Sequence, residues 1–272
     1  MVVYIPALFY QQFNADYCME VPAEGFNGWQ KERVPIDLHH TALVIMHAWN
    51  TGSYDEYPGW YRYVEYLPRA KAICEEVFPK LINAVRGSPM EVFHVVSSAD
   101  YYKSYPGYER AKRSARKIRK YIPENVSRIK KGKTRKDLDA FRSRLAGVGS
   151  HNAEDIERGF INLDFAPNSK PVGNEGIAES SRQLAGLCRN SDIDHLIYVG
   201  FAINWCLLLS PGGMAEMSKH GLLCSTIKEA TTAVENDFTA REEWCKKIAL
   251  WRVALKFGFV FELDDFFYGL SG

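Results

Sequence analysis

The sequence has no apolar run long enough to cross a bilayer among its 272 residues. Its first residues also lack the basic segment followed by an apolar segment that marks a secretory signal peptide. These two absences predict a cytoplasmic protein without a membrane partner. We find no internal repeat and no low-complexity segment, so a solenoid or a disordered chain is excluded as well.

The six cysteines are widely spaced, and no two of them form a C-x-x-C pair. This spacing indicates neither a zinc site nor a dense disulfide framework, and it agrees with a reducing compartment. We therefore expect no metal and no cofactor. The ordinary role of any one such cysteine is that of a small buried apolar side chain.

The net charge is only +1, so the chain as a whole has no field that would attract nucleic acid. Positive charge is concentrated instead, because residues 110–144 contain 15 of the 34 lysines and arginines. This stretch holds no known nucleic-acid motif, and Tyr121 and Phe141 are too far apart to form a stacking platform for bases. We expect a basic helical insertion at about residues 107–158 that faces acidic surface or a partner subunit. A nucleic-acid accessory protein is the weaker alternative.

Predicted strands and helices alternate along the chain. Strand patterns cover residues 42–46, 92–96, 160–165, 194–200, 222–227 and 259–263, and helical patterns cover residues 67–86, 176–188, 204–220 and 237–256. This order predicts an α/β protein, a three-layer α/β/α sandwich with a central, mostly parallel sheet of about six strands. Residues 1–36 are aromatic and irregular, and we expect them to form an N-terminal arm on a domain of residues 37–272.

Polar side chains collect where the predicted strands end. His47, His94 and Asp164 each lie at or near such an end, and so does the segment 200–206. Open parallel sheets bind ligands at the carboxyl ends of their strands. The sequence therefore predicts a site at this edge.

Cys206 is the candidate nucleophile. The apolar run Leu196-Ile197-Tyr198-Val199 leads into Gly200, and the cysteine follows six residues later, where a helical pattern begins. A helix N-terminus favours the thiolate, which is the reactive form of cysteine. The alternative is a buried structural cysteine.

The segment Gly200-Phe201-Ala202-Ile203-Asn204-Trp205-Cys206 resembles the nucleophile turn of the isochorismatase-like cysteine hydrolases, a family that includes nicotinamidases. In the family this turn has seven positions in order: a glycine, an apolar residue, an alanine, a threonine, either an aspartate or an asparagine, any residue, and the catalytic cysteine. The segment that runs from Thr41 to Asn50 resembles the first strand of the family. The resemblance covers about residues 34–100 and 160–265 in order, and it indicates a divergent member.

This resemblance implies a three-layer fold and hydrolysis of an amide, or of an enol ether, with Cys206 as the nucleophile that forms a thioester. It also implies a cis peptide between Phe201 and Ala202, with an oxyanion hole formed by the backbone N–H groups of Ala202 and Cys206. Asn204 belongs to the same turn and is a candidate binding residue. The family commonly forms oligomers, so we expect a homo-oligomer in which the helix at residues 237–256 could pair.

The triad of the family consists of aspartate, lysine and cysteine, and this sequence departs from it at two positions. His47 occupies the aspartate position. The lysine normally ends the strand before the nucleophile strand; if that strand is 160–165, it offers Asp164, with Lys170 nearby in the loop. His47 could then act as the base in a Cys–His–Asp relay with Asp164. The alternative is that the aspartate was lost and His47 fills space.

Trp49 and Asn50 follow the first strand and are expected to line the pocket. Loop aromatics could cap it, which would suit a planar substrate; these are Tyr54, Tyr57, Trp60, Tyr101, Tyr102 and Tyr105. His94 could join His47 at a metal, but the aspartate and two histidines that some nicotinamidases use are not visible, so a hydrogen-bonded histidine is expected.

Two functions follow from these patterns. The leading prediction is a cysteine-dependent hydrolase of a small amide-type substrate. The alternative is a catalytically silent protein of this fold that binds a small ligand or a protein partner, because the expected aspartate is His47 and the expected lysine is not in place.

Overall fold

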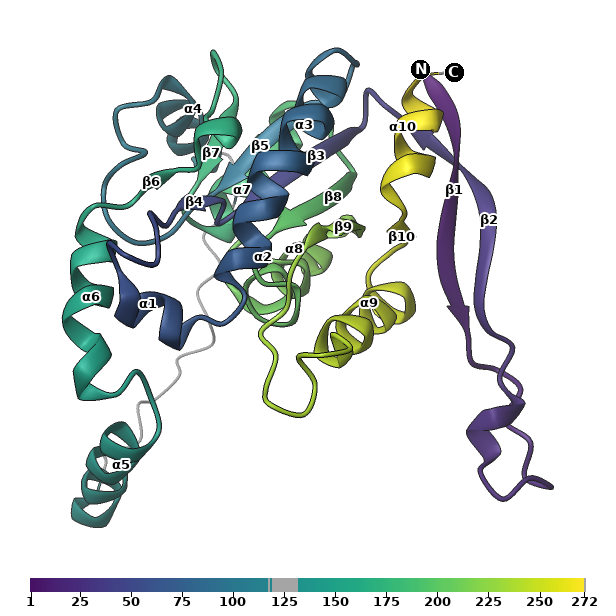
Figure 1. Cartoon of the computed structure of the whole chain (residues 1–272). Coiled ribbons are helices and arrows are strands. Elements are labelled where there is room, and N and C mark those ends of the chain that lie inside the picture. The colour runs from purple at the N-terminus through teal and green to yellow at the C-terminus, as the bar shows by residue number, and fades with distance from the viewer. Residues whose placement is uncertain (117, 119–131, 272) are drawn as a thin grey trace.

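The computed structural model describes residues 1–116, 118 and 132–271. Eight strands form one sheet in the order β2-β1-β10-β9-β8-β3-β5-β7 (Figure 1). They are β1 (Val2–Gln11), β2 (Gly28–Asp37), β3 (Thr41–Met46), β5 (Glu91–Val95), β7 (Gly176–Ala178), β8 (His195–Gly200), β9 (Leu223–Thr231) and β10 (Val260–Phe261). From β10 to β7 all neighbours run parallel, whereas β1 is antiparallel to both β10 and β2.

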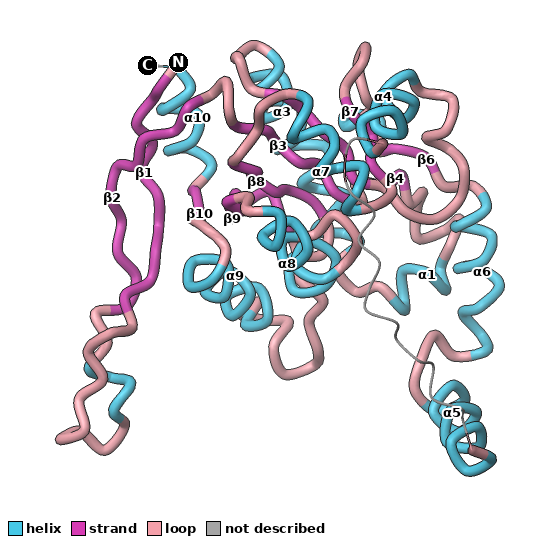
Figure 2. The backbone as a smooth tube through the Cα atoms, turned by 180° about the vertical axis from the view of Figure 1, so that it is seen from behind, coloured by secondary structure: helices cyan, strands magenta, loops and turns pink. Residues whose placement is uncertain are grey.

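Helices cover both faces of this sheet (Figures 1 and 2). The α-helices are α1 (Pro58–Tyr63), α2 (Leu67–Ala72), α3 (Phe78–Arg86), α4 (Pro106–Ala115), α5 (Lys133–Leu145), α6 (Ser150–Ile161), α7 (Ser181–Asn190), α8 (Met214–Met217), α9 (Trp244–Lys256) and α10 (Leu263–Ser271). Short helical turns are η1 (Pro22–Gly25), η2 (Ile73–Val77), η3 (Pro167–Ser169), η4 (Ile203–Leu207) and η5 (Ser218–His220). Within the part of the chain described here, no helix is long and apolar enough to span a bilayer.

The two faces of the sheet divide the core into two layers. Leu43 and Ile45 of β3 pack with residues of α3 and α10 on one face. Ala42 and Val44 pack with residues of α7 and α9 on the other face. Every residue of β3 and β8 is buried, which explains why both strands are mostly apolar after their first residue and do not alternate between apolar and polar side chains. The predicted three-layer α/β/α fold is confirmed.

The sheet has eight strands rather than the predicted six or so. Three strands of the sheet, β7, β1 and β2, were not predicted, and one predicted strand is not part of it. Of the three, β1 and β2 lie in the segment that was expected to be an irregular arm. They pair over ten residues, from Val2 opposite Asp37 to Gln11 opposite Gly28. Val3, Ile5 and Ala7 are buried while their neighbours are not, so the alternation of a strand is present beneath the aromatic composition.

The predicted strand at 160–165 is wrong. Helix α6 continues to Ile161, and only Asp164–Phe165 is extended, as β6. That short strand pairs with β4 (Trp49–Asn50) in a separate two-stranded sheet. The strand that precedes β8 in the main sheet is β7, whose three residues form too short an apolar run to stand out in the sequence.

The predicted basic insertion at about residues 107–158 contains most of α4, all of α5 and most of α6, so its described part is mainly helical. Helix α6 packs against α1, and α5 extends from the body without a buried residue (Figure 1). Residues 117 and 119–131, which include Tyr121, lie outside the described residues.

Candidate functional site

A cavity of about 730 Å³ opens at the carboxyl ends of β3 and β8. Its wall comes from the segments that follow these strands, from α1, α2 and α6, and from η3. Predicted site residues that line it are Cys206, His47, Trp49, Asn50 and Phe201. The cavity therefore lies where an open parallel sheet is expected to bind a ligand.

Strand β8 ends in a turn that requires glycine at position 200. Gly200 has φ of 118°, and a Cβ at this position would lie 2.0 Å from the carbonyl oxygen of Met46. The Phe201–Ala202 peptide bond that follows is cis, as the resemblance predicted. Helix η4 then begins and carries Cys206, which is half-buried and lines the cavity.

Hydrogen bonds from the loop after β9 fix the position of the nucleophile turn. The N–H of Ile203 donates to the carbonyl of Thr232 at 2.7 Å. Asn204 forms two bonds of 2.9 Å with Val234: its side-chain amide donates to the carbonyl, and its side-chain oxygen accepts the backbone N–H. Asn204 was predicted to bind ligand, but it does not line the cavity; both of its amide atoms are used to position the turn.

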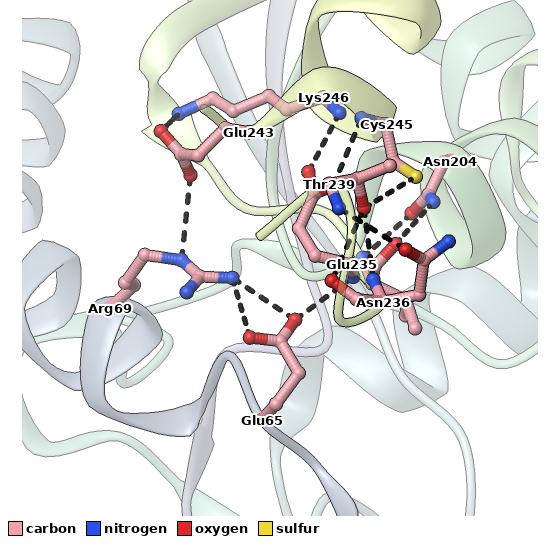
Figure 3. A network of polar contacts seen from close by, with 10 residues as sticks. Glu65, Arg69, Asn204, Glu235, Asn236, Thr239, Glu243, Cys245 and Lys246 are labelled. Carbon is pink, nitrogen blue, oxygen red and sulfur yellow. Dashed lines mark hydrogen bonds and ion pairs between the residues drawn. The ribbon is translucent and has the colours of Figure 1, made fainter. Parts of the chain in front are cut away.

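A polar network beside Asn204 ties the same loop to the cavity wall (Figure 3). The buried carboxylate of Glu235 accepts the N–H groups of Cys245 and Lys246 at the start of α9, at 3.0 and 2.9 Å. The backbone N–H of Glu235 donates to Glu65 at 2.9 Å, and Arg69 of α2 donates to the same carboxylate. These hydrogen bonds therefore link helix α2, the loop after β9 and helix α9 to one another.

His47 lies directly after β3 in the left-handed region, with φ of 53°. Its ring is 6% exposed, stacks on Trp49 at 4.8 Å, and has Nε2 3.1 Å from the hydroxyl of Ser97. The Nδ1 atom is buried and has no hydrogen-bond partner among the described residues. Burial lowers the pKa of His47 to about 4, so the imidazole is neutral near pH 7.

Asp164 and Lys170 do not reach the cavity. They form an ion pair of 3.0 Å on the surface, and Asp164 also accepts the N–H of Phe165. Asp164 lies on β6 opposite Asn50, outside the main sheet, and it makes no contact with His47 that would fix the imidazole. The predicted Cys–His–Asp relay is therefore not formed.

The residue that ends the strand before β8 is also not a lysine. Strand β7 leads into Glu179, whose carboxylate accepts the hydroxyls of Tyr102 and Tyr108 at 2.7 and 2.8 Å. Burial opposes ionisation of Glu179, but these bonds outweigh it and lower its pKa. At the position where the resemblance implies a lysine, this chain therefore has Glu179, whose carboxylate is hydrogen-bonded to two tyrosines.

His94 lies inside the fold and not in the cavity. Its Nε2 is 3.0 Å from Glu175, which also pairs with Arg86 at 2.7 Å. Burial lowers the pKa of His94, and Glu175 partly opposes this effect. Among the described residues, no group of three or more His, Cys, Asp or Glu side chains could hold a metal ion.

Several lining residues were not predicted from the sequence. Phe160 lines the cavity from α6, although it was assigned to a strand, and Trp205 lies beside the thiol. Tyr66 lines the cavity next to the Glu65 network; burial, followed by the charge of the Cys206 thiolate, raises the pKa of Tyr66 well above its usual value. Tyr66 could have been predicted as a lining residue only if the sequence had shown which end of the predicted helix at 67–86 faces Cys206.

The sequence matches no protein-family model and no curated protein. Its structure is similar to that of a cysteine hydrolase from Pseudomonas syringae pv. phaseolicola, with a TM-score of 0.53 and 15% identity over 88% of this chain and 96% of that chain. An isochorismatase family protein from Burkholderia thailandensis is also similar, with a TM-score of 0.48 and 15% identity over 86% of this chain and 97% of that chain. At such identities the likeness to the Pseudomonas cysteine hydrolase establishes the fold alone, and this fold agrees with the α/β/α sandwich that the sequence predicted.

Proposed function

We propose that this protein is a cysteine-dependent hydrolase that cleaves the C–N bond of an amide substrate, with Cys206 as the nucleophile. One observation carries the proposal: the thiol lines a cavity directly after a cis-peptide turn, and His47 lines the same cavity. The name of the similar Pseudomonas structure, a cysteine hydrolase, supports it.

The reaction would proceed in two steps. The sulfur of Cys206 attacks the carbonyl carbon, and the backbone N–H groups of Ala202 and Cys206 stabilise the oxyanion. The C–N bond breaks, and the amine leaves with a proton, so that a thioester remains on Cys206. Water then attacks the thioester, which releases the carboxylic acid and returns the thiol.

His47 is the group proposed to move the proton. Its Nδ1 can accept one, because it has no hydrogen-bond partner among the described residues and the ring contacts the Ser97 hydroxyl through Nε2. A resting imidazolium is unfavourable in this site, because burial lowers the pKa of His47 to about 4. We therefore expect His47 to take the thiol proton as the sulfur attacks, as a general base.

A silent ligand-binding protein is the second candidate. Two observations favour it: burial keeps His47 neutral, and neither Asp164 nor Lys170 lines the cavity. In that case the cavity and the turn would serve recognition only.

Amine release from a panel of amides, compared between the wild type and Cys206→Ser, tests the proposal. We expect the variant to lose at least about a thousandfold in kcat/KM, because a hydroxyl is a far weaker nucleophile than a thiol here. Cys18→Ser is the matched control, since Cys18 is exposed and distant from the cavity lining. Equal activity in Cys206→Ser would rule out the nucleophile, and ligand binding without any amine release would favour the silent protein.

A further inference from the structure

The cavity contains a continuous row of aromatic rings that begins beside the nucleophile turn. His47 stacks on Trp49 at 4.8 Å, and Trp49 meets Phe160 edge to face at 6.1 Å. Phe160 in turn stacks on Trp60 at 5.3 Å. All four side chains line the cavity, so the row extends from the reactive end of the site to helix α1.

The row is rigidly built. Trp60 of α1 lies against Gly159 of α6, where a Cβ would be only 2.2 Å from the indole ring. Trp49 donates its indole N–H to the hydroxyl of Tyr101 at 2.8 Å. Because the rings already have fixed positions, a planar ligand would lose little binding free energy in ordering them.

Further aromatic side chains line the same cavity from other elements. Phe201 and Trp205 come from the nucleophile turn, Tyr63 comes from the end of α1, and Tyr66 comes from the segment that joins α1 to α2. At about 730 Å³ the cavity is also in the range of pockets that enclose a ligand of drug-like size. Its walls would leave most of a very small amide without contact.

The lining offers little to a negatively charged ligand. Within the described residues, Lys71 is the one lysine or arginine that lines the cavity, and it lies 4.0 Å from Glu75. Glu56, which also lines the cavity, adds a second carboxylate. The His47 imidazole is neutral at pH 7. A carboxylate on the substrate would lose its hydration and gain no unpaired cation.

We propose that the cavity selects uncharged amides that carry an extended aromatic group, which lies along the ring row while the carbonyl carbon faces Cys206. This assignment of a substrate class rests on the proposed hydrolase function. The row of rings predicts a preference for aromatic ligands, and the cavity volume predicts a ligand larger than a simple amide. Among the described residues that line the cavity there is no unpaired cation, so ligands with a carboxylate are disfavoured.

Binding to the Cys206→Ser protein, measured by calorimetry or by quenching of tryptophan fluorescence, tests the ligand class without turnover. We expect 2-naphthamide to bind more tightly than benzamide by roughly tenfold or more, because the second ring buries additional apolar area. Benzamide should bind about two- to twelvefold more tightly than cyclohexanecarboxamide, which has the same size without a π-face. Acetamide and 2-naphthoate should bind more weakly than 2-naphthamide by at least about a hundredfold.

Phe160→Leu in the same background removes a ring from the row and keeps an apolar side chain. It should abolish the preference for benzamide over cyclohexanecarboxamide, whereas Tyr54→Leu, which changes an exposed ring outside the lining, should not. The ligand series on the unaltered row serves as the test if Phe160→Leu does not fold. Equal binding of benzamide and cyclohexanecarboxamide, or tighter binding of 2-naphthoate, overturns the ligand class.

Different experimental results would contradict the hydrolase proposal and the proposed ligand class. If aromatic amides bind to Cys206→Ser but the wild type releases no amine from them or from any other amide, the hydrolase proposal is wrong and the ligand class stands. If the wild type hydrolyses acetamide-sized substrates and the aromatic amides do not bind, the ligand class is wrong and the hydrolase stands.

Discussion

At the scale of single residues, Gly200 decides whether the site can form. Its φ of 118° is unfavourable for any residue with a Cβ, and the added atom would lie 2.0 Å from the backbone of β3. Because β3 and β8 are adjacent, a shift here would move His47 and Cys206 relative to each other. The glycine thus sets the distance between the two strands at the point where both end.

We expect Gly200→Ala to reduce the free energy of unfolding by at least about 3 kcal/mol, or to prevent folding, since both strain and overlap are involved. Gly221→Ala is the control: Gly221 also has positive φ, 85°, but nothing lies within 4 Å of its Cβ position. That variant should lose only about 1 kcal/mol. Urea unfolding gives both values, and equal losses would show that the contact with β3 is unimportant.

His47 should also be visible in the pH dependence of stability. Its pKa is about 4 in the folded protein, below its ordinary value, so the unfolded chain binds a proton first as pH falls from about 6.5 to 4. Stability therefore decreases with acidification in this window, by about 2 kcal/mol at pH 5 from this residue. His47→Gln should show a correspondingly shallower loss between pH 7 and pH 5 in urea titrations. His195 remains in both proteins and has the same direction of shift, so it does not affect the difference. Parallel curves for the two proteins would contradict the buried, neutral imidazole.

At the scale of elements, the loop after β9 supports the short helix that carries Cys206. This loop fixes η4 by three hydrogen bonds, two between Asn204 and Val234 and one between Ile203 and Thr232. The buried Glu235 carboxylate fixes the other end of this loop to α9. The position of the thiol therefore depends on a loop that does not line the cavity.

Asn204→Ala should slow alkylation of Cys206 by iodoacetamide by about tenfold or change its pH profile, because the turn loses both bonds. Each lost bond should also cost about 1 kcal/mol of stability. Asn190→Ala is the matched control, since Asn190 donates one bond to Ser114 far from the turn. If both variants lose similar stability and Cys206 reactivity stays that of the wild type in both, Asn204 has no positioning role.

The elements also show what the sequence can predict. Strands β3, β5 and β8 were predicted because both of their faces are largely buried and each contains a short run of mostly apolar residues. Strand β7, which precedes the nucleophile strand along the chain, was missed because it has only three residues. The structure brings five predicted site residues together in the lining of one cavity, since strand ends meet at one edge of a sheet; these are Cys206, His47, Trp49, Asn50 and Phe201. Asp164, His94 and Asn204 do not line it, because the partner that each side chain meets depends on tertiary packing that no local pattern records.

At the scale of the whole molecule, α9 presents an apolar face to solvent. Trp244 and Ile248 are 51% and 54% exposed, while Ala249, Leu250 and Val253 on the other side are buried in the core. The oligomer that was predicted from the sequence would bury this exposed face.

Trp244→Glu together with Ile248→Glu should therefore reduce the mass measured by size-exclusion chromatography with light scattering, without loss of fold, because both positions are half-exposed. Leu138→Glu on α5, which is also an exposed apolar residue, is the control and should leave the mass unchanged. A mass that stays the same in the α9 variant would show that α9 is not the interface.

The two edges of the sheet differ in a way that affects association. On one side the outer strand is β2, whose central residues Lys31, Glu32 and Arg33 precede Pro35. Charge and a missing N–H both discourage another chain from adding a strand there. On the other side β7 is three residues long and is covered by α4. A second copy that extends the sheet would find neither edge suitable. The charged outer strand of the β1–β2 ribbon therefore disfavours edge-to-edge aggregation, and a homo-oligomer would have to form through the helical layers.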